Sequence, residues 1–154
     1  MNDALNLAVR DATLDMFQSV LGKTAQGAAP VESAANARTY ETAVVISFMG
    51  GISGAFALRC SKKLAANIAS QMLGTDIAEG SDDMRDAIGE FFNMVVGAAK
   101  TRFATNGEPF KISVPTTIIG DNYVLHIKAN EAEKLTRIDF GCEGDSLSVE
   151  VYLK

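Results

Sequence analysis

The chain has 154 residues, 47% of them hydrophobic, and a formal net charge of −5, and we expect residues 1–154 to form a single domain. The basic residues form no cluster, which argues against a nucleic-acid partner. No apolar run approaches the roughly 18 residues of a membrane span, and the first residues lack a basic signal-peptide region, so the sequence predicts a cytoplasmic protein without a membrane partner.

The first half of the chain predicts a helix, a loop, a hairpin and a second helix. Residues 4–21 have the spacing of an amphipathic helix, and the Ala-rich segment 23–38 has no firm period and predicts a loop. The β-branched segments 42–47 and 52–59, separated by a glycine pair, predict a hairpin. A serine before residues 62–73 and a glycine after them indicate a short capped helix.

The second half predicts a long helix followed by four strands. The helix spans 82–104, and the strand-like segments are 110–119, 123–129, 135–140 and 146–153. Short polar turns separate most of these segments, which favours antiparallel neighbours. The fold class predicted from this order is α+β, with a mostly antiparallel sheet covered by two long helices.

The predicted helix 82–104 has two faces of opposite chemistry. Its apolar residues share the core-facing side: Ile88, Phe91, Phe92, Val95, Val96 and Ala99. Asp86, Glu90, Asn93 and Gly97 fall together on the other side. A solvated face usually carries mixed lysine and glutamate without small residues, so this combination favours a surface that a partner docks against. An ordinary solvated face is the alternative.

The polar residues of that face suit the positioning of a reactant. Asp86, Glu90 and Asn93 are spaced by one helical turn each and project side by side. An asparagine amide offers one acceptor and two donors, so it can orient a water molecule without changing its protonation. Phosphoryl transfer to water depends strongly on such positioning, and a glutamate can anchor a cationic group of a partner.

A shift of the chain on itself by 75 residues reveals an internal similarity. The stretch from Asp11 to Gly22 aligns with the stretch from Asp86 to Gly97, and five of twelve positions are identical. Each stretch precedes a strand pair, so we expect two related halves packed about a pseudo-twofold axis. Chance similarity between two amphipathic helices is the alternative.

The sequence offers little for a free-standing active site. It has no Gly-rich phosphate loop and no nucleophile arrangement. Cys60 and Cys142 lack a metal-binding spacing, and we interpret them as small buried hydrophobic residues in a reducing compartment. His126 lies in a predicted strand, where a surface or edge position is expected. No cofactor or metal is predicted for the chain itself.

The pattern Asp86-x-x-x-Glu90-x-x-Asn93, followed after 21 residues by Pro115, resembles the signature of the CheX/CheC/FliY family of chemotaxis phosphatases. The predicted hairpin and the short helix after it are also similar to that family. The resemblance implies a CheC-like fold with the pseudo-twofold repeat described above.

The resemblance implies that the chain dephosphorylates the phospho-aspartate of a CheY-like response regulator in chemotaxis signalling. Glu90 and Asn93 would be its catalytic residues: Glu90 would pair with a lysine of the regulator, and Asn93 would align water against the acyl phosphate. Asp86 and Gly97 would contact the partner, the glycine allowing a close backbone approach. The regulator would supply a magnesium ion, so the chain would need no cofactor of its own.

Members of this family differ in the number of motif copies. CheC-type members carry two, whereas CheX-type members carry one and resemble a homodimer built through sheet edges. Here Asp15 and Gln18 replace Glu and Asn in the first helix, and the residue 75 positions before Pro115 is Tyr40 rather than proline. We therefore expect a CheX-like homodimer with one active face, on the second long helix.

Two other functions stay open at this point. A non-catalytic module would use the same face to bind a receiver domain or a flagellar-switch component without hydrolysis. A small-molecule binding domain, with its cleft between the two halves, is a third alternative. No polar constellation in the sequence supports that cleft.

Overall fold

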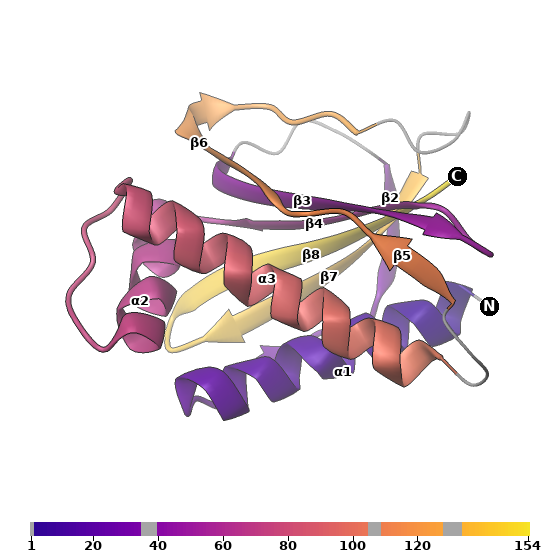
Figure 1. Ribbon diagram of the computed structural model, residues 1–154, viewed down its shortest axis with the longest axis horizontal. Helices are drawn as coiled ribbons and strands as arrows, with labels where there is room; N and C mark the ends of the chain where they lie inside the picture. The colour runs from indigo at the N-terminus through magenta and orange to yellow at the C-terminus, as the bar shows by residue number, and fades with distance from the viewer. Residues whose placement is uncertain (1, 35–39, 105–108, 128–133) are drawn as a thin grey trace.

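The computed structural model describes residues 2–34, 40–104, 109–127 and 134–154, which form three helices and eight strands (Figure 1). The helices are α1 (Asn2–Leu21), α2 (Lys62–Leu73) and α3 (Asp82–Phe103). The strands are β1 (Gln26–Gly27), β2 (Val31–Ala34), β3 (Tyr40–Gly50), β4 (Gly54–Cys60), β5 (Phe110–Ile112), β6 (Thr116–Tyr123), β7 (Lys134–Cys142) and β8 (Asp145–Leu153).

The three predicted helices are confirmed, and their ends follow the predicted signals. At the start of α2, the Ser61 hydroxyl accepts a hydrogen bond from the backbone N–H of Leu64 at 3.0 Å. At the start of α3, the Ser81 hydroxyl accepts one from the backbone N–H of Met84 at 3.2 Å. Gly74 has a φ of 70° and ends α2, a conformation that glycine adopts without steric cost.

Three local predictions are wrong. The segment 23–38 is not one loop, because β1 and β2 form in it and pair with β7; its residues 35–38 lie outside the described residues. The segment 123–129 is not a strand. Tyr123 ends β6, His126 lies exposed in the irregular segment 124–127, and residues 128 and 129 are outside the described residues. The polar residues 120–122 bulge within β6 opposite β3 instead of forming a turn.

The strands form one antiparallel sheet in which β8 and β4 are central. The order is β1-β7-β8-β4-β3-β5, with β2 also pairing β7 and β6 also pairing β3. The helices lie together on one face of this sheet (Figure 1). The predicted α+β class with a helix-covered antiparallel sheet is therefore confirmed, although the sheet has eight strands rather than six.

Two halves of the chain have matching topology. The first runs α1, β1, β2, β3, β4 and the second runs α3, β5, β6, β7, β8, with α2 inserted between them. The hairpins β3–β4 and β7–β8 meet where β4 pairs with β8, and each half contributes a divided outer strip, β1–β2 or β5–β6. The predicted pseudo-twofold arrangement is thus present in the strand order.

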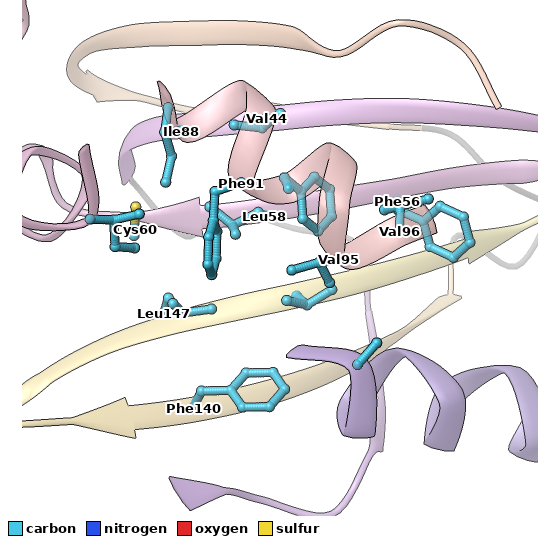
Figure 2. Close-up of a cluster of buried hydrophobic side chains, with 14 of the residues drawn as sticks. Val44, Phe56, Leu58, Cys60, Ile88, Phe91, Val95, Val96, Phe140 and Leu147 are labelled. Carbon is cyan, nitrogen blue, oxygen red and sulfur yellow. The ribbon is translucent and has the colours of Figure 1, made fainter. Parts of the chain in front are cut away.

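The core lies between the helices and the sheet. Figure 2 shows Ile88, Phe91 and Val95 of α3 pointing toward the strands that carry Leu58 and Leu147. All three helix residues are fully buried, and the ring of Phe91 meets Phe17 of α1 edge-on, at a centroid distance of 5.6 Å. Each large apolar side chain buried in this way contributes about 1.5–3 kcal/mol. This packing fixes the rotation of α3 about its axis.

Both cysteines are buried and free, as interpreted from the sequence. Cys60 faces the main core, where burial raises the pKa of its thiol to about 12. Cys142 lies at the end of β7 and is 8% exposed. Neither thiol is therefore a ready thiolate nucleophile at neutral pH.

The opposite face of the sheet holds a buried polar cluster. Arg59 of β4 is 2% exposed and its Nε donates to the Glu150 carboxylate on β8. Its Nη2 donates to the Tyr152 hydroxyl at 3.1 Å and to the carbonyl of Leu125 at 2.9 Å. The last of these bonds holds the segment after β6 against this face. Desolvation raises the pKa of the Tyr152 hydroxyl, so it stays a hydrogen-bonding neutral group.

Candidate functional site on helix α3

The four residues predicted to share a face of α3 lie on the side of the helix that the core does not use. Asp86 and Glu90 are exposed, and Asn93 and Gly97 are half-buried. Because the apolar stripe of the same helix is held against the sheet, these four positions are turned outward together. The structure thus gathers the predicted site residues on one surface.

Pro115, distant in sequence, is brought beside this surface. Arg85, Asp86, Gly89 and Glu90 of α3 line an open depression of about 310 Å³, together with Pro115 and Thr117 from the strip next to the helix. The two carboxylates lie in the helix and the proline in the sheet edge. Asp86 and Glu90 therefore share one surface feature with the downstream proline, whereas Asn93 is not among the residues that line it.

Gly89 is a residue of this site that the sequence reasoning missed. A Cβ atom built on it would lie 3.1 Å from Thr117 Oγ1 and 3.7 Å from Pro115 Cγ. The glycine therefore allows the strip to lie against α3 at the point between Asp86 and Glu90. The available signal was a glycine in the interior of a predicted helix, a position that costs about 1 kcal/mol relative to alanine.

The polar side chains of this face have no partners within the part of the chain that the structure describes. No hydrogen bond or ion pair there engages the side chains of Asp86, Glu90 or Asn93. The neighbouring Arg85 pairs with Asp82 at the start of α3. Two carboxylates and one amide are consequently available to a partner without the loss of a contact to any described residue.

The matching face of α1 is engaged by the rest of the chain. Asp15 forms an ion pair with Arg102 at the end of α3. The side-chain oxygen of Gln18 accepts a hydrogen bond from the Thr24 hydroxyl at 3.2 Å. Asp15 and Gln18 align with Glu90 and Asn93. Their polar groups therefore make contacts within the chain.

Two arginines at equivalent positions of the repeat, Arg10 on α1 and Arg85 on α3, also differ in whether they bind the neighbouring strip. Arg10 of α1 donates from Nη2 to the carbonyl of Gly27 at 3.0 Å and from Nε to the carbonyl of Ala28 at 3.2 Å, and it pairs with Asp11. These bonds tie α1 to its neighbouring strip. Arg85 instead stays at the edge of the depression on α3.

Pro115 lies in a β-bulge between β5 and β6. From Ile112 to Thr116 the strip carries one residue more than the facing part of β3, where these two residues pair with Phe48 and Val45. The backbone N–H of Ser113 still donates to the carbonyl of Ser47 at 2.9 Å. A bulge accommodates proline because one residue there makes no ladder bond.

The same bulge recurs in the first half, and it corrects a prediction. From Gly27 to Val31 the strip beside β7 also carries one extra residue, and Pro30 immediately precedes Val31 as Pro115 precedes Thr116. The expectation that the first half lacks the proline because Tyr40 lies 75 residues before Pro115 is therefore wrong. The structural counterpart is Pro30.

Pro30, rather than the residue 75 positions before Pro115, is the counterpart because the two helices end at different points of the repeat. Gly22 has a φ of 65° and follows the last residue of α1, whereas Gly97 lies inside α3, which continues to Phe103. The strip after α3 is therefore displaced along the sequence relative to the strip after α1. A Cβ atom at Gly97 would meet nothing within 4 Å, so this position faces open space.

The described residues supply hydrogen-bonding and charged groups on this face. Among them, no group of three or more His, Cys, Asp or Glu side chains is arranged to hold a metal ion. No helix in the described ranges is long and apolar enough to cross a lipid bilayer. The two carboxylates of this face can pair with a cation, and the amide of Asn93 can orient a reactant.

Comparison with known proteins identifies the family. The model of the family "Chemotaxis phosphatase CheX" matches residues 42–140. No curated protein sequence matches the chain. A CheX crystal structure from Desulfovibrio desulfuricans is 24% identical and has a TM-score of 0.86, the match covering 97% of this chain and 99% of that one.

Two further solved structures share the fold. The CheX–CheY–BeF3–Mg²⁺ complex from Borrelia burgdorferi gives a TM-score of 0.75 at 16% identity, over 96% of each chain. FliY from Thermotoga maritima gives 0.72 at 20% identity, over 97% of this chain and 86% of that one. With its family-model match spanning most of the chain and this shared fold, the protein belongs to the chemotaxis phosphatase CheX family.

Proposed function

We propose that this protein dephosphorylates the phospho-aspartate of a CheY-like response regulator, acting on it in trans. The observation that carries the proposal is the outward pair Glu90 and Asn93, one helical turn apart and unengaged within the described residues. The family match supports a phosphatase role, and a related CheX has been crystallised with CheY.

Asn93 is the proposed catalytic residue. Its amide has an acceptor and two donors, so it can hold a water molecule while contacting a second oxygen of the reactants. The water oxygen bonds to phosphorus, and the bond from phosphorus to the aspartyl oxygen breaks with its electron pair left on the aspartate carboxylate. Both protons of the water leave on the phosphate, as dihydrogen phosphate. Holding the water in line accounts for the catalysis, because positioning contributes much of the rate of phosphoryl transfer.

Glu90 is proposed to orient the bound regulator. Its exposed carboxylate is placed to pair with a lysine of the regulator, next to the depression lined by Pro115 and Thr117. Asp86 and Gly97 are proposed as further partner contacts on the same face. The magnesium ion is proposed to come with the regulator, consistent with the magnesium in the Borrelia CheX–CheY complex.

The proposal extends to the state of the protein in the cell. We propose that residues 1–154 act as one domain, in the cytoplasm, as a homodimer that pairs through a sheet edge. The short strands of the strips β1–β2 and β5–β6 lie at the two edges available for such pairing. Sedimentation equilibrium tests the dimer, and a monomer at micromolar concentration would contradict it.

A phosphate-release assay tests the proposed activity. A CheY-type regulator is phosphorylated with a small phosphodonor, and loss of the phosphoryl group is followed with wild-type protein, Asn93→Ala and Gln18→Ala. We expect the wild type to accelerate the loss and Asn93→Ala to leave only the intrinsic rate of the regulator. Gln18→Ala, the matched change on α1, is expected to behave as the wild type.

The same assay separates the enzyme from the alternative of a non-catalytic binding module. Equal rates with wild type and Asn93→Ala would overturn the proposal. Binding of the wild type to the phosphorylated regulator without a change in phosphoryl lifetime would favour a module that only recognises a receiver domain.

A further inference from the structure

Gly89 lies at the contact between α3 and the strip that carries Pro115. Gly89 is buried, and because it has no side chain, nothing separates its alpha carbon from Thr117. An added Cβ atom would crowd Thr117 Oγ1 at 3.1 Å and would lie in ordinary van der Waals contact with Pro115 Cγ at 3.7 Å. Thr117 is paired with Val44 in the sheet, which holds the backbone of the strip beside α3 at this point.

The first half shows that this glycine is not needed to build the fold. Leu14 occupies the position of Gly89 in α1, and it packs against the core. The proline bulge nevertheless forms beside α1, where Arg10 holds the strip through the carbonyls of Gly27 and Ala28. A helix with a leucine at this position therefore supports the same bulge.

The difference lies in the surface that results. On α3, Gly89 and Thr117 line the open depression together with Glu90. Asn93 follows Gly89 by four residues and so lies on the same side of the helix. The strip therefore meets α3 at Gly89, on the side of the helix that carries Asn93.

We infer that Gly89 is a positioning residue for the proposed phosphatase reaction: by omitting a side chain it seats the Pro115–Thr117 strip against α3, and so sets the projection of Asn93 into the partner. This inference rests on the proposed function. It assigns Gly89 no contact with the reactants, because its effect passes through the seating of the helix and the strip.

Gly89→Ala separates positioning from stability. Alanine is favoured over glycine in a helix interior, which offsets the crowding at Thr117. We therefore expect the midpoint of urea unfolding to stay near that of the wild type. A displacement of a few tenths of an ångström is expected to lower kcat on the order of tenfold, since about 1 Å can cost a hundredfold.

Binding provides the readout that a merely structural role would not separate. The affinity for a CheY-type receiver activated with beryllofluoride and Mg²⁺ is expected to stay within about twofold of wild type, because the charged groups that dock remain in place. A loss of binding in parallel with kcat would overturn the inference.

Rescue tests the contact itself. Thr117→Ala removes the atom closest to the added Cβ, so kcat of Gly89→Ala/Thr117→Ala is expected to return to that of Thr117→Ala alone. An equal loss from Gly89→Ala in both backgrounds would overturn the inference. If Gly89→Ala fails to fold, Thr117→Leu crowds the same contact with a larger side chain on the strip. An unchanged kcat in Thr117→Leu would overturn the inference.

The two proposals fail in different ways. If wild-type protein leaves the phosphoryl lifetime of the regulator unchanged, the proposed function is wrong. If wild type is active, Asn93→Ala is inactive and Gly89→Ala keeps full kcat, only the positioning role of Gly89 is wrong.

Discussion

The outward faces of α1 and α3 are two versions of the same surface. Both helices belong to equivalent halves, and a shift of 75 residues places five buried positions of α1 on buried positions of α3: Val9, Ala12, Thr13, Phe17 and Leu21. Asp15 and Gln18 on α1 are held by Arg102 and Thr24. On α3, Glu90 has no such contact within the described residues. Equivalent backbones thus present one face whose polar groups make internal contacts and one whose polar groups make none within the described residues.

The difference teaches that the core and the outer face of these helices are specified separately. Burial against the sheet fixes the rotation of both helices, because each large apolar side chain loses stability when it is turned outward. A change of one methylene group in a side chain, Asp for Glu or Gln for Asn, alters the outer face without disturbing that packing. The following tests would sharpen or break this comparison.

The largest effect is expected when α3 is given the polar residues of α1. Glu90→Asp with Asn93→Gln retracts the carboxylate by one methylene and pushes the amide outward by one. A misplacement of about 1 Å is expected to lower kcat for phosphate release about a hundredfold. The measurement is phosphate release at saturating phosphorylated regulator.

The reciprocal exchange on α1 is the matched control. Asp15→Glu with Gln18→Asn, made in the inactive Asn93→Ala background, is expected to restore no activity. Arg102 and Thr24 remain beside the new side chains, and Leu14 remains where α3 has Gly89. Activity from this variant would contradict the comparison, because a Glu/Asn pair would then be sufficient for catalysis on either helix.

A smaller effect is expected when the charge of Glu90 is removed. Glu90→Gln should weaken binding to a beryllofluoride-activated receiver about fivefold, the effect of an exposed ion pair worth about 1 kcal/mol. The loss should shrink in high salt, which screens exposed charges. Titration by fluorescence anisotropy measures it. Asp15→Asn should leave this affinity unchanged, and an equal loss from both variants would contradict the assignment of Glu90 to the docking face.

The smallest effect is expected on stability. Asp15→Asn removes the ion pair with Arg102, whose two side chains are 58% and 43% exposed. Such a pair contributes less than about 1 kcal/mol to the free energy of unfolding. Glu90→Gln removes no ion pair of the described residues and should leave that free energy unchanged. Urea unfolding of both variants measures the difference, and a larger loss from Glu90→Gln would show that its carboxylate has a structural role.

Much of the fold could be predicted because helix signals are local. Ser61 and Ser81 cap the two helices that their positions indicated, and the apolar stripe of α3 is the buried one. The divided strips were harder to predict. β1 spans two residues, too few for an alternating pattern to be recognised, and it exists through pairing with β7. β5 lies within the predicted segment 110–119, but its separation from β6 was not predicted.

The site was predicted in part for the same reason. Glu90 and Asn93 share a helical face by spacing alone, so their common orientation follows from the sequence. The partnership of Gly89 with Thr117 could not be predicted, because it joins a helix to a strip far along the chain. The counterpart of Pro115 was misassigned to Tyr40, since a fixed shift ignores the extra length of α3.

The sequence by itself determined which helix face is apolar, where the capped helices begin and which helix carries the Glu/Asn pair. These properties depend on residues within a few turns of one another. Only the tertiary structure decided that the α1 face is engaged by Arg102 and Thr24, that Pro30 matches Pro115, and that α3 borders an open depression. Those outcomes depend on the pairing of strips with strands remote in the sequence, which local spacing does not encode.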